Sequence, residues 1–249
     1  MAIVGNAISL ITLKALIHVT TKPGATVTFK KGSTTMGTKT ANSSGVAELE
    51  VLSGDWGSWT IDVSWSASGI ATAATGSSSV TISAATTYNV SVTVKWYLIQ
   101  NGNFCSGFNH TYHATTGTRN EFRDEGDYIW LTTDTQMQYG NSFVSGYFTN
   151  GIDMGDWNNM YIDCQAIGGN SYAGIVTDTS AGEASFSNSV LTGGTVKAYT
   201  ARDTKNLSLS GVTGTKYIAL RAQSFAVWDS SGVSGSYGAI KVYNLYLQR

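Results

Sequence analysis

Apolar and polar residues alternate with a period of two over much of this chain, and no stretch shows sustained helical spacing. In the run 58–65, Trp59, Ile61 and Val63 alternate with polar residues, and the run 47–51 follows the same pattern. Because successive side chains of a strand point to opposite faces, each run has one buried and one solvated face. Clusters of Gly, Asn, Asp and Ser end the runs, as turns require. The pattern predicts an all-β fold.

The first of these runs form a compact group that resembles a known module. The stretches Gly24–Thr28, Asn42–Ala47 and Gly54–Ile61 are similar to the carboxypeptidase-regulatory-like, Ig-like modules of bacterial surface proteins and phage virion proteins. The resemblance implies a small antiparallel β-sandwich over residues 20–95. It implies no particular activity, since such modules serve as spacers or decoration in many settings.

The residues before this module, 1–19, form a separate apolar piece. Ile11, Leu13, Ile17 and Val19 fall on one side of an alternating pattern, which favours a strand, whereas the apolar residues between 3 and 11 also fit one face of a short helix. Two interpretations remain open for this segment. It docks on a neighbouring subunit, or it adds a strand to the sandwich that follows.

A second set of strand-like runs fills residues 96–249 and predicts a larger β-sandwich or jelly roll. The last run carries Ile240, Val242, Leu245 and Leu247. These positions would put apolar residues on both faces, as in a central strand, so we expect the C-terminus to be tied into a sheet.

This region also shows a resemblance. Asn150–Asp163, Tyr217–Leu220 and Ile240–Leu247 are similar to the jelly-roll domains found at the ends of structural proteins of phages that infect Gram-positive bacteria. Those domains are similar in outline to carbohydrate-binding modules. The resemblance implies a fold and names no ligand.

Composition excludes some classes of partner. Charged residues make up 12% of the chain, the formal net charge is −1, and the longest basic cluster is Lys30–Lys31. We therefore expect neither nucleic acid nor an anionic membrane as a partner.

Residues 1–19 lack a basic n-region and are too short to span a bilayer, so we interpret them as neither a signal peptide nor a membrane anchor. An extracellular role would then need another route of release, such as a virion freed by lysis.

The reactive side chains do not form a recognisable catalytic or metal site. His110 and His113 lie three apart in a segment predicted as loop or strand, where such positions point to opposite sides. The acidic residues between 121 and 127 are interleaved with Arg119 and Arg123, which favours a solvated, self-neutralised loop over a calcium site. The four acidic residues are Glu121, Asp124, Glu125 and Asp127. We expect no metal and no cofactor.

Catalytic carboxylates and nucleophiles are equally hard to find. Asp153 and Asp156 read as turn residues that bind local backbone, and residues 169–174 miss the nucleophile-elbow spacing by one position. Cys105 and Cys164 could form at most one disulfide, and we favour a small buried core residue for Cys164. No catalytic residue is predicted.

Aromatic residues make up 11% of the chain. An exposed ring beside amides or carboxylates can stack on the C–H face of a sugar while the polar groups bind its hydroxyls. Four rings beside polar, turn-like segments are our candidates for carbohydrate binding: Trp130, Trp157, Trp228 and Tyr237. The alternative for each ring is packing in the core or at its rim. Trp56, Trp59 and Trp65 are assigned to the core of the first sandwich.

Together these features predict a non-enzymatic structural protein of a bacteriophage virion. We expect it to be associated with the tail or baseplate, with residues 1–19 bound to other virion proteins and the C-terminal domain bound to host cell-surface glycans. The alternatives are a capsid decoration protein or head fibre, and a free carbohydrate-binding module. A homo-oligomer is expected, for which a trimer is one form, although no heptad seam supports a coiled coil.

Overall fold

The computed structural model describes residues 12–70, 72–105, 108–113, 119–134, 140–148, 150–166, 170–177, 189–192, 195–197, 201–229, 232–235 and 238–249. The chain divides into two compact units. The first contains residues up to 65 together with 75–94, and the second contains 66–74 and 95–249. Each unit is described by itself below.

The all-β prediction is confirmed. Besides two short 3₁₀ turns, every regular element among the described residues is a strand. None of the described helical segments has the length and apolar character of a membrane span.

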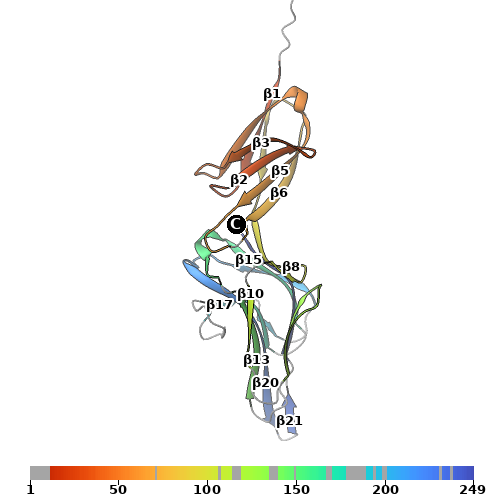
Figure 1. The fold of residues 1–249 in the computed structure, drawn as a ribbon, viewed down its shortest axis with the longest axis vertical. Helices are drawn as coiled ribbons and strands as arrows, with labels where there is room; N and C mark the ends of the chain where they lie inside the picture. The colour runs from red at the N-terminus through yellow and green to blue at the C-terminus, as the bar shows by residue number, and fades with distance from the viewer. Residues whose placement is uncertain are drawn as a thin grey trace, which may run out of the picture. The chain divides into compact units, whose positions relative to one another are not determined.

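Two sheets make up the first unit, and Figure 1 draws their strands from red to yellow. One sheet has the order β4-β1-β7, and the other has the order β6-β5-β2-β3. The elements are β1 (Lys14–Thr20), β2 (Thr26–Lys31), β3 (Thr34–Thr40), β4 (Val46–Leu52), η1 (Ser53–Asp55), β5 (Gly57–Trp65), β6 (Ala74–Ile82) and β7 (Thr87–Ser91).

Residues 14–20 form the central strand of the smaller sheet. Ala15, Ile17 and Val19 of β1 are 0–1% exposed and pack in the core. On the opposite face, His18 lies directly across from Glu48 of β4, and their side chains meet at 2.7 Å. Added-strand packing is therefore the interpretation that holds for 14–20, while residues 1–11 lie outside the described residues.

One strand pair of the first unit is parallel. β1 runs antiparallel to β4 but parallel to β7, with Ile17 opposite Tyr88 and Val19 opposite Val90. Sequence alternation does not distinguish parallel from antiparallel pairing, because both have the same side-chain period. The antiparallel sandwich was predicted for residues 20–95, and no orientation was predicted for the preceding residues that make up most of β1.

Alternation did identify the core of the first unit. Trp59, Ile61, Val63 and Trp65 of β5 are all buried, at 8% exposure or less, as expected, whereas Trp56 is only half-buried. The remaining core is apolar and comes from both sheets. Its members include Val27, Phe29, Ala47, Val51, Ile82, Val90 and Val92.

The second unit also has two sheets, and Figure 1 shows its strands from yellow to blue. In one sheet β22 has β15 along one side and β12 followed by β8 along the other; β11 lies beyond β12, β19 lies beyond β15, and β9 pairs with β8. The elements of this sheet are β8 (Lys95–Gln100), β9 (Asn103–Phe104), β11 (Arg119–Asp124), β12 (Ile129–Asp134), β15 (Asn159–Ala166), β19 (Asp203–Ser208) and β22 (Gly238–Gln248).

The other sheet of the second unit has the order β10-β13-β20-β16-β17, and shorter strands are attached to it. Its elements, with the 3₁₀ turn η2, are β10 (Phe108–His113), β13 (Gly140–Phe148), β14 (Ile152–Asp153), η2 (Met154–Asp156), β16 (Asn170–Thr177), β17 (Ser189–Thr192), β18 (Thr195–Lys197), β20 (Thr215–Asp229) and β21 (Gly232–Gly235).

The last strand, β22, is central in its sheet, so the prediction that the C-terminus is tied into a sheet is confirmed. It pairs with β15 along one side and with β12 and then β8 along the other. Ile240, Val242, Leu245 and Leu247 are all 0% exposed.

These four apolar residues nevertheless do not divide between two buried faces. Opposite β15, the register of β22 jumps from Val242, which faces Cys164, to Asn244, which faces Asp163, leaving Tyr243 as the extra residue of a β-bulge. The bulge reverses the alternation, so Ile240 and Val242 before it and Leu245 and Leu247 after it are buried on the same face. The expectation of two apolar faces is wrong, and the second face is free to carry polar and aromatic side chains.

Candidate functional site

The outward face of β22 carries a depression of about 490 Å³ beside the bulge. Its lining comes from four separate parts of the second unit: the β8–β9 turn, the β11–β12 turn, the start of β19 and the bulge itself. We call it the β22 pocket and define it by Asn101, Asp127, Tyr128, Arg202 and Tyr243. A volume of this size falls within the usual range for small-molecule sites, about 300–1,000 Å³.

A two-point ion pair fixes Arg202 in the pocket. Its Nε donates to Asp163 Oδ1 at 2.8 Å and its Nη2 donates to Asp163 Oδ2 at 2.6 Å. Asn244 Nδ2 adds a third hydrogen bond to the same carboxylate at 2.9 Å. The hydrogen bonds from the Arg202 guanidinium hold the pKa of Asp163 below its usual value. Burial acts in the opposite direction, and the hydrogen bond from Asn244 lowers the pKa further. Two parallel N–H···O bonds also set the guanidinium plane.

The guanidinium lies against an aromatic ring. Arg202 Cζ is 3.7 Å from the ring centroid of Tyr243, a stacked arrangement that orients both groups. The Arg202 side chain is 52% exposed although its Nε and Nη2 are engaged. Its Nη1 is therefore the nitrogen best placed to donate to a ligand in the pocket.

Three further side chains extend this aromatic and polar surface. Tyr128 lies 5.6 Å from Tyr243 between ring centroids and 6.2 Å from Trp130, edge to face in the second case. The Lys241 ammonium lies 4.3 Å from the Tyr128 centroid and 5.6 Å from that of Trp130. Each ring is half-buried, so each combines a fixed position with an accessible part.

Two turns frame the pocket through close backbone contact. Asn101 and Gly102 connect β8 to β9 and both have positive φ, at 49° and 76°, the pattern of an Asn-Gly hairpin turn. Gly102 N donates to Tyr243 O, and Asn101 N donates to Asn244 Oδ1, each at 2.9 Å. A Cβ on Gly102 would lie 2.2 Å from the backbone N of Tyr128 in the second turn, between β11 and β12, so only glycine allows the two turns to come this close.

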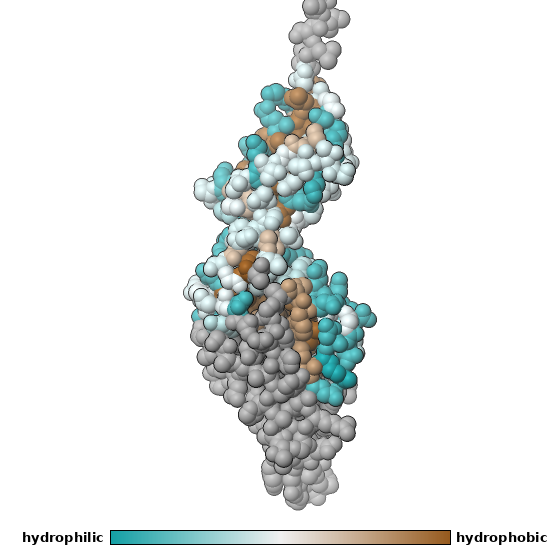
Figure 2. All heavy atoms as spheres, viewed as in Figure 1, coloured by the Kyte–Doolittle hydropathy of each residue, from teal (hydrophilic) through white to brown (hydrophobic). Residues whose placement is uncertain are grey.

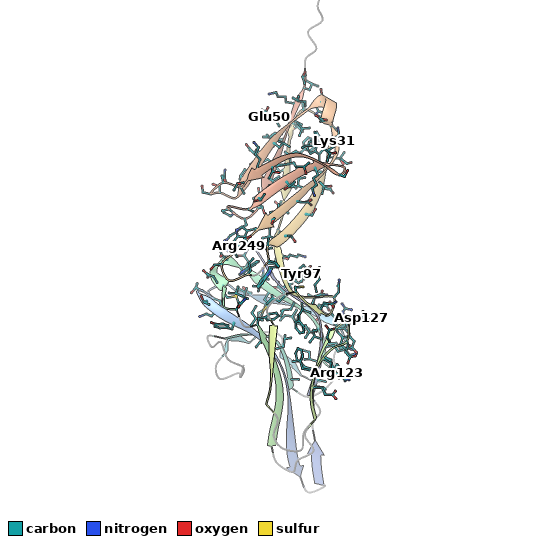
Figure 3. All side chains as sticks on the ribbon, viewed as in Figure 1. Lys31, Glu50, Tyr97, Arg123, Asp127 and Arg249 are labelled. Carbon is teal, nitrogen blue, oxygen red and sulfur yellow. The ribbon has the colours of Figure 1, made fainter. Side chains whose placement is uncertain are left out.

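Figures 2 and 3 place this region on the second unit. Figure 2 shows hydrophilic side chains gathered over the side of the unit where the β11–β12 hairpin lies, and Figure 3 labels Arg123 and Asp127 of that hairpin and Tyr97 of β8. Asp127 and Asn101 are exposed. The pocket therefore offers a carboxylate, an amide and a guanidinium next to aromatic rings, which is suited to binding a polyhydroxylated ligand.

The four rings predicted to bind carbohydrate have different outcomes. Trp130 lies on β12 at the border of the β22 pocket. Trp157 is 3% exposed and stacks on the buried Trp96 at 6.3 Å, so its prediction as an exposed platform is wrong: the alternative, core packing, applies. Trp228 lies within β20, but its side chain is outside the described residues, as is the whole of Tyr237.

The acidic run 121–127 forms a hairpin rather than a loop, because β11 pairs with β12 across it. Arg123 Nη2 lies 2.9 Å from Glu121 and its Nε lies 3.3 Å from Glu125, which agrees with the self-neutralised interpretation. Within the described ranges no group of three His, Cys, Asp or Glu side chains is arranged to hold a metal ion. His110 and His113 are in β10, with side chains outside the described residues.

Two other predictions concern single residues. Asp153 Oδ1 accepts a hydrogen bond from Gly155 N at 3.1 Å, so it binds local backbone as expected. Cys164 is buried in the core at 2% exposure, and both it and Cys105 are free thiols. Burial raises the pKa of Cys164 to about 11. The prediction of a buried core cysteine is confirmed.

The first unit has a hollow of its own, of about 380 Å³, that lacks the features of the β22 pocket. The residues that line it are Thr28, Asp62, Val63, Ser64, Thr75, Gly76 and Ser77, with no aromatic ring among them. Its carboxylate, Asp62, is already engaged by Lys30 at 2.6 Å and by Ser77 at 2.8 Å. The β22 pocket is the better candidate site.

Sequence reasoning missed most of the pocket. Asp127 was singled out only as a member of an acidic run, and Arg202, Tyr128 and Tyr243 were not singled out at all. The Asn101–Gly102 pair was a usable signal for a tight hairpin. Nothing local to Arg202 signals its ion pair with Asp163, because the two residues are brought together only by the pairing of β19 with β15.

Comparison with known protein families and with curated proteins finds no match to this chain.

Proposed function

We propose that the second unit is a carbohydrate-binding domain and that the β22 pocket is its binding site. The observation that carries the proposal is the pocket lining itself, where Tyr128 and Tyr243 stand beside the Asp127 carboxylate, the Asn101 amide and the Arg202 guanidinium. Aromatic rings pack against the C–H face of a sugar, and planar polar groups bind its hydroxyls.

The charges of the site favour a neutral glycan. Arg202 and Asp163 neutralise each other through two hydrogen bonds. Of the remaining charged groups, Asp127 carries one negative charge and Lys241 one positive charge beside Tyr128. An anionic ligand would meet the Asp127 carboxylate, and a cationic ligand would meet the Lys241 ammonium. The site therefore discriminates by hydroxyl pattern and ring shape instead of by net charge.

The whole chain is proposed to be a non-enzymatic structural component of a bacteriophage virion, made in the bacterial cytoplasm and carried on the particle. Support comes from the resemblance of residues 24–61 to virion Ig-like modules and of 150–163 to phage jelly rolls, together with a surface poor in charge. With a glycan site in the second unit, a tail or baseplate position explains more than the alternatives, which are capsid decoration, a head fibre or a free carbohydrate-binding module.

The glycan proposal is tested by matched substitutions in one turn. Asp127 lines the pocket, whereas Glu125, two residues away, pairs with Arg123 and does not line it. We expect the full-length protein to bind neutral glycans on a printed array that also displays acidic and amino glycans. Asp127→Asn should weaken that binding at least about tenfold, since it removes a charged hydrogen-bond acceptor, and Glu125→Gln should leave it unchanged. Equal effects of the two changes, or no binding to any glycan, would reject the site.

The virion proposal needs a different truncation from the one that the sequence suggests. Removing residues 1–19 would delete Ala15, Ile17 and Val19 from the core, so loss of binding would only report unfolding. Removing residues 1–11 leaves β1 intact. Co-sedimentation of both full-length and truncated protein with purified phage heads, tails and host cell walls should show truncation-sensitive binding to tails. Binding to heads alone would favour the decoration protein.

A further inference from the structure

Besides the β22 pocket, the same outward face of the sheet carries a row of tyrosines. Tyr97 of β8, Tyr246 of β22 and Tyr161 of β15 occupy directly opposed positions in three neighbouring strands. Tyr161 and Tyr246 stack with centroids 5.0 Å apart and planes 12° apart, and Tyr97 meets Tyr246 at 5.0 Å. We call these three residues the tyrosine row.

The bulge in β22 is the reason that the row and the pocket share one face. In a regular strand Tyr243 and Tyr246, three residues apart, would point to opposite sides of the sheet. Here the extra residue at the bulge reverses the alternation, and both side chains are half-buried while Val242 and Leu245 are fully buried beneath them. Bulges often redirect side chains in this way beside functional sites.

Polar groups connect the pocket to the row. Asn244 lies between Tyr243 and Tyr246 along β22, and its amide bridges from Asp163 to the backbone N–H of Asn101. Tyr243 OH also reaches Gln165 Oε1 at 3.4 Å. The surface between the two aromatic groups is therefore made of amides and a carboxylate, the side-chain types that bind sugar hydroxyls.

The row offers hydroxyl groups as well as rings. A tyrosine hydroxyl is protonated at neutral pH at its ordinary pKa of about 10 and can donate; burial is the largest cause that raises the pKa of Tyr246 further. The Lys95 ammonium lies 4.9 Å from the Tyr246 ring centroid and covers part of that ring. Each tyrosine is half-buried, which leaves part of every side chain accessible.

We infer that the β22 pocket and the tyrosine row are two subsites of one elongated binding face, and that its ligand is an oligosaccharide chain running along β22. Tyr246 lies three residues beyond Tyr243; two regular rises from Asn244 to Tyr246 and the short step at the bulge separate them by about 8 Å along the strand. This is longer than one pyranose ring, so a single sugar cannot occupy both subsites. The inference rests on the proposed function and adds the size of the ligand to it.

The alternative explanation for the row is purely structural, since cross-strand aromatic pairs stabilise sheets. Chain-length dependence separates the two explanations. The assay measures the affinity of the full-length protein for immobilised neutral oligosaccharides of one to six hexose units, using wild type, Tyr161→Ala and Tyr161→Phe. Thermal unfolding of each variant confirms that it is folded under the binding conditions.

We expect wild type to bind the longer oligosaccharides about tenfold more tightly than the monosaccharide, as one added aromatic subsite allows. Tyr161→Ala should remove this gain while leaving monosaccharide binding unchanged, and Tyr161→Phe should restore most of it because the ring is retained. Equal affinity of wild type for all lengths would overturn the two-subsite face but keep the pocket. An undiminished gain in a folded Tyr161→Ala protein would also overturn it. Binding of no oligosaccharide at all would reject the proposed function and this inference together.

Discussion

The clearest single test of the frame around the β22 pocket is a pair of glycine-to-alanine substitutions in adjoining turns. Gly102 has φ +76° and a Cβ there would lie 2.2 Å from Tyr128 N and 2.3 Å from Asp127 C. Gly126 has nearly the same φ, +83°, but a Cβ there would meet nothing within 4 Å. The two changes therefore impose the same backbone strain and differ in the steric clash alone.

The expected magnitudes follow from these contacts. Alanine in the left-handed region costs about 1–2 kcal/mol at either position. The clash at Gly102 is with backbone that cannot rotate away, so it adds about 1–3 kcal/mol, as overpacking does. For a unit of this size, the added cost lowers the melting temperature by a further 2–12 °C or so. Gly102→Ala also displaces Asp127 and Tyr128, and so it should weaken glycan binding, whereas Gly126→Ala should not.

Differential scanning calorimetry of the full chain measures the change in melting temperature, and titration with a neutral glycan that the wild-type protein binds measures the change in affinity. Equal melting temperatures for Gly102→Ala and Gly126→Ala would show that a side chain at Gly102 meets no clash. Glycan binding by Gly102→Ala as tight as that of wild type would show that the Asn101–Gly102 turn does not hold the pocket in shape.

Three further predictions concern the core of the first unit, the Arg202–Asp163 ion pair and the two cysteines. Ile17→Ala should destabilise the first unit by about 2–5 kcal/mol in chemical denaturation, because it empties a fully buried position of β1. Leu13→Ala, at a residue that is 47% exposed, should change the free energy of unfolding by less than about 0.5 kcal/mol. Equal effects of the two changes would place β1 outside the core. The pKa of Asp163 is lowered in the folded state, so its stabilising contribution is complete above the unfolded pKa of about 3.9 and disappears as pH falls through the lower folded pKa. Asp163→Asn should therefore remove this loss of stability from the acidic part of a plot of unfolding free energy against pH. An unchanged acidic part would contradict the ion pair between Asp163 and Arg202. Cys164, buried with a pKa of about 11, should react with a maleimide only on unfolding. The partly exposed Cys105 should be labelled first in the native protein, as measured by mass spectrometry. Labelling of both cysteines at equal rates would show that Cys164 is accessible.

Much of the fold was predictable because burial on one face leaves a period-two pattern in the sequence. The run from Trp59 to Trp65 is regular, and the structure buries its apolar members as expected. The run from Ile240 to Leu247 contains a bulge, and a bulge shifts the period by one residue without leaving a Gly or Pro to mark it. The same four apolar residues therefore suggested two faces when they cover only one.

The candidate site was less predictable because its members meet only through strand pairing. Arg202 reaches Asp163 since β19 lies beside β15, and Asn101 reaches Asn244 since the β8–β9 turn lies beside the bulge. Local polarity was a poor guide to exposure. Trp157 has polar neighbours in sequence and yet packs on Trp96 in the core, because a turn can carry polar side chains outward while directing one large ring inward.

Amide chemical-shift mapping by NMR, with the neutral oligosaccharide that binds most tightly, would locate the ligand on the protein. We expect the largest shifts on titration to fall on the five residues of the β22 pocket and to continue along β22 to Tyr246. Shifts centred on the hollow of the first unit, around Asp62 and Ser77, would contradict this expectation, and so would a tight-binding glycan that leaves Tyr128, Arg202 and Tyr243 unshifted.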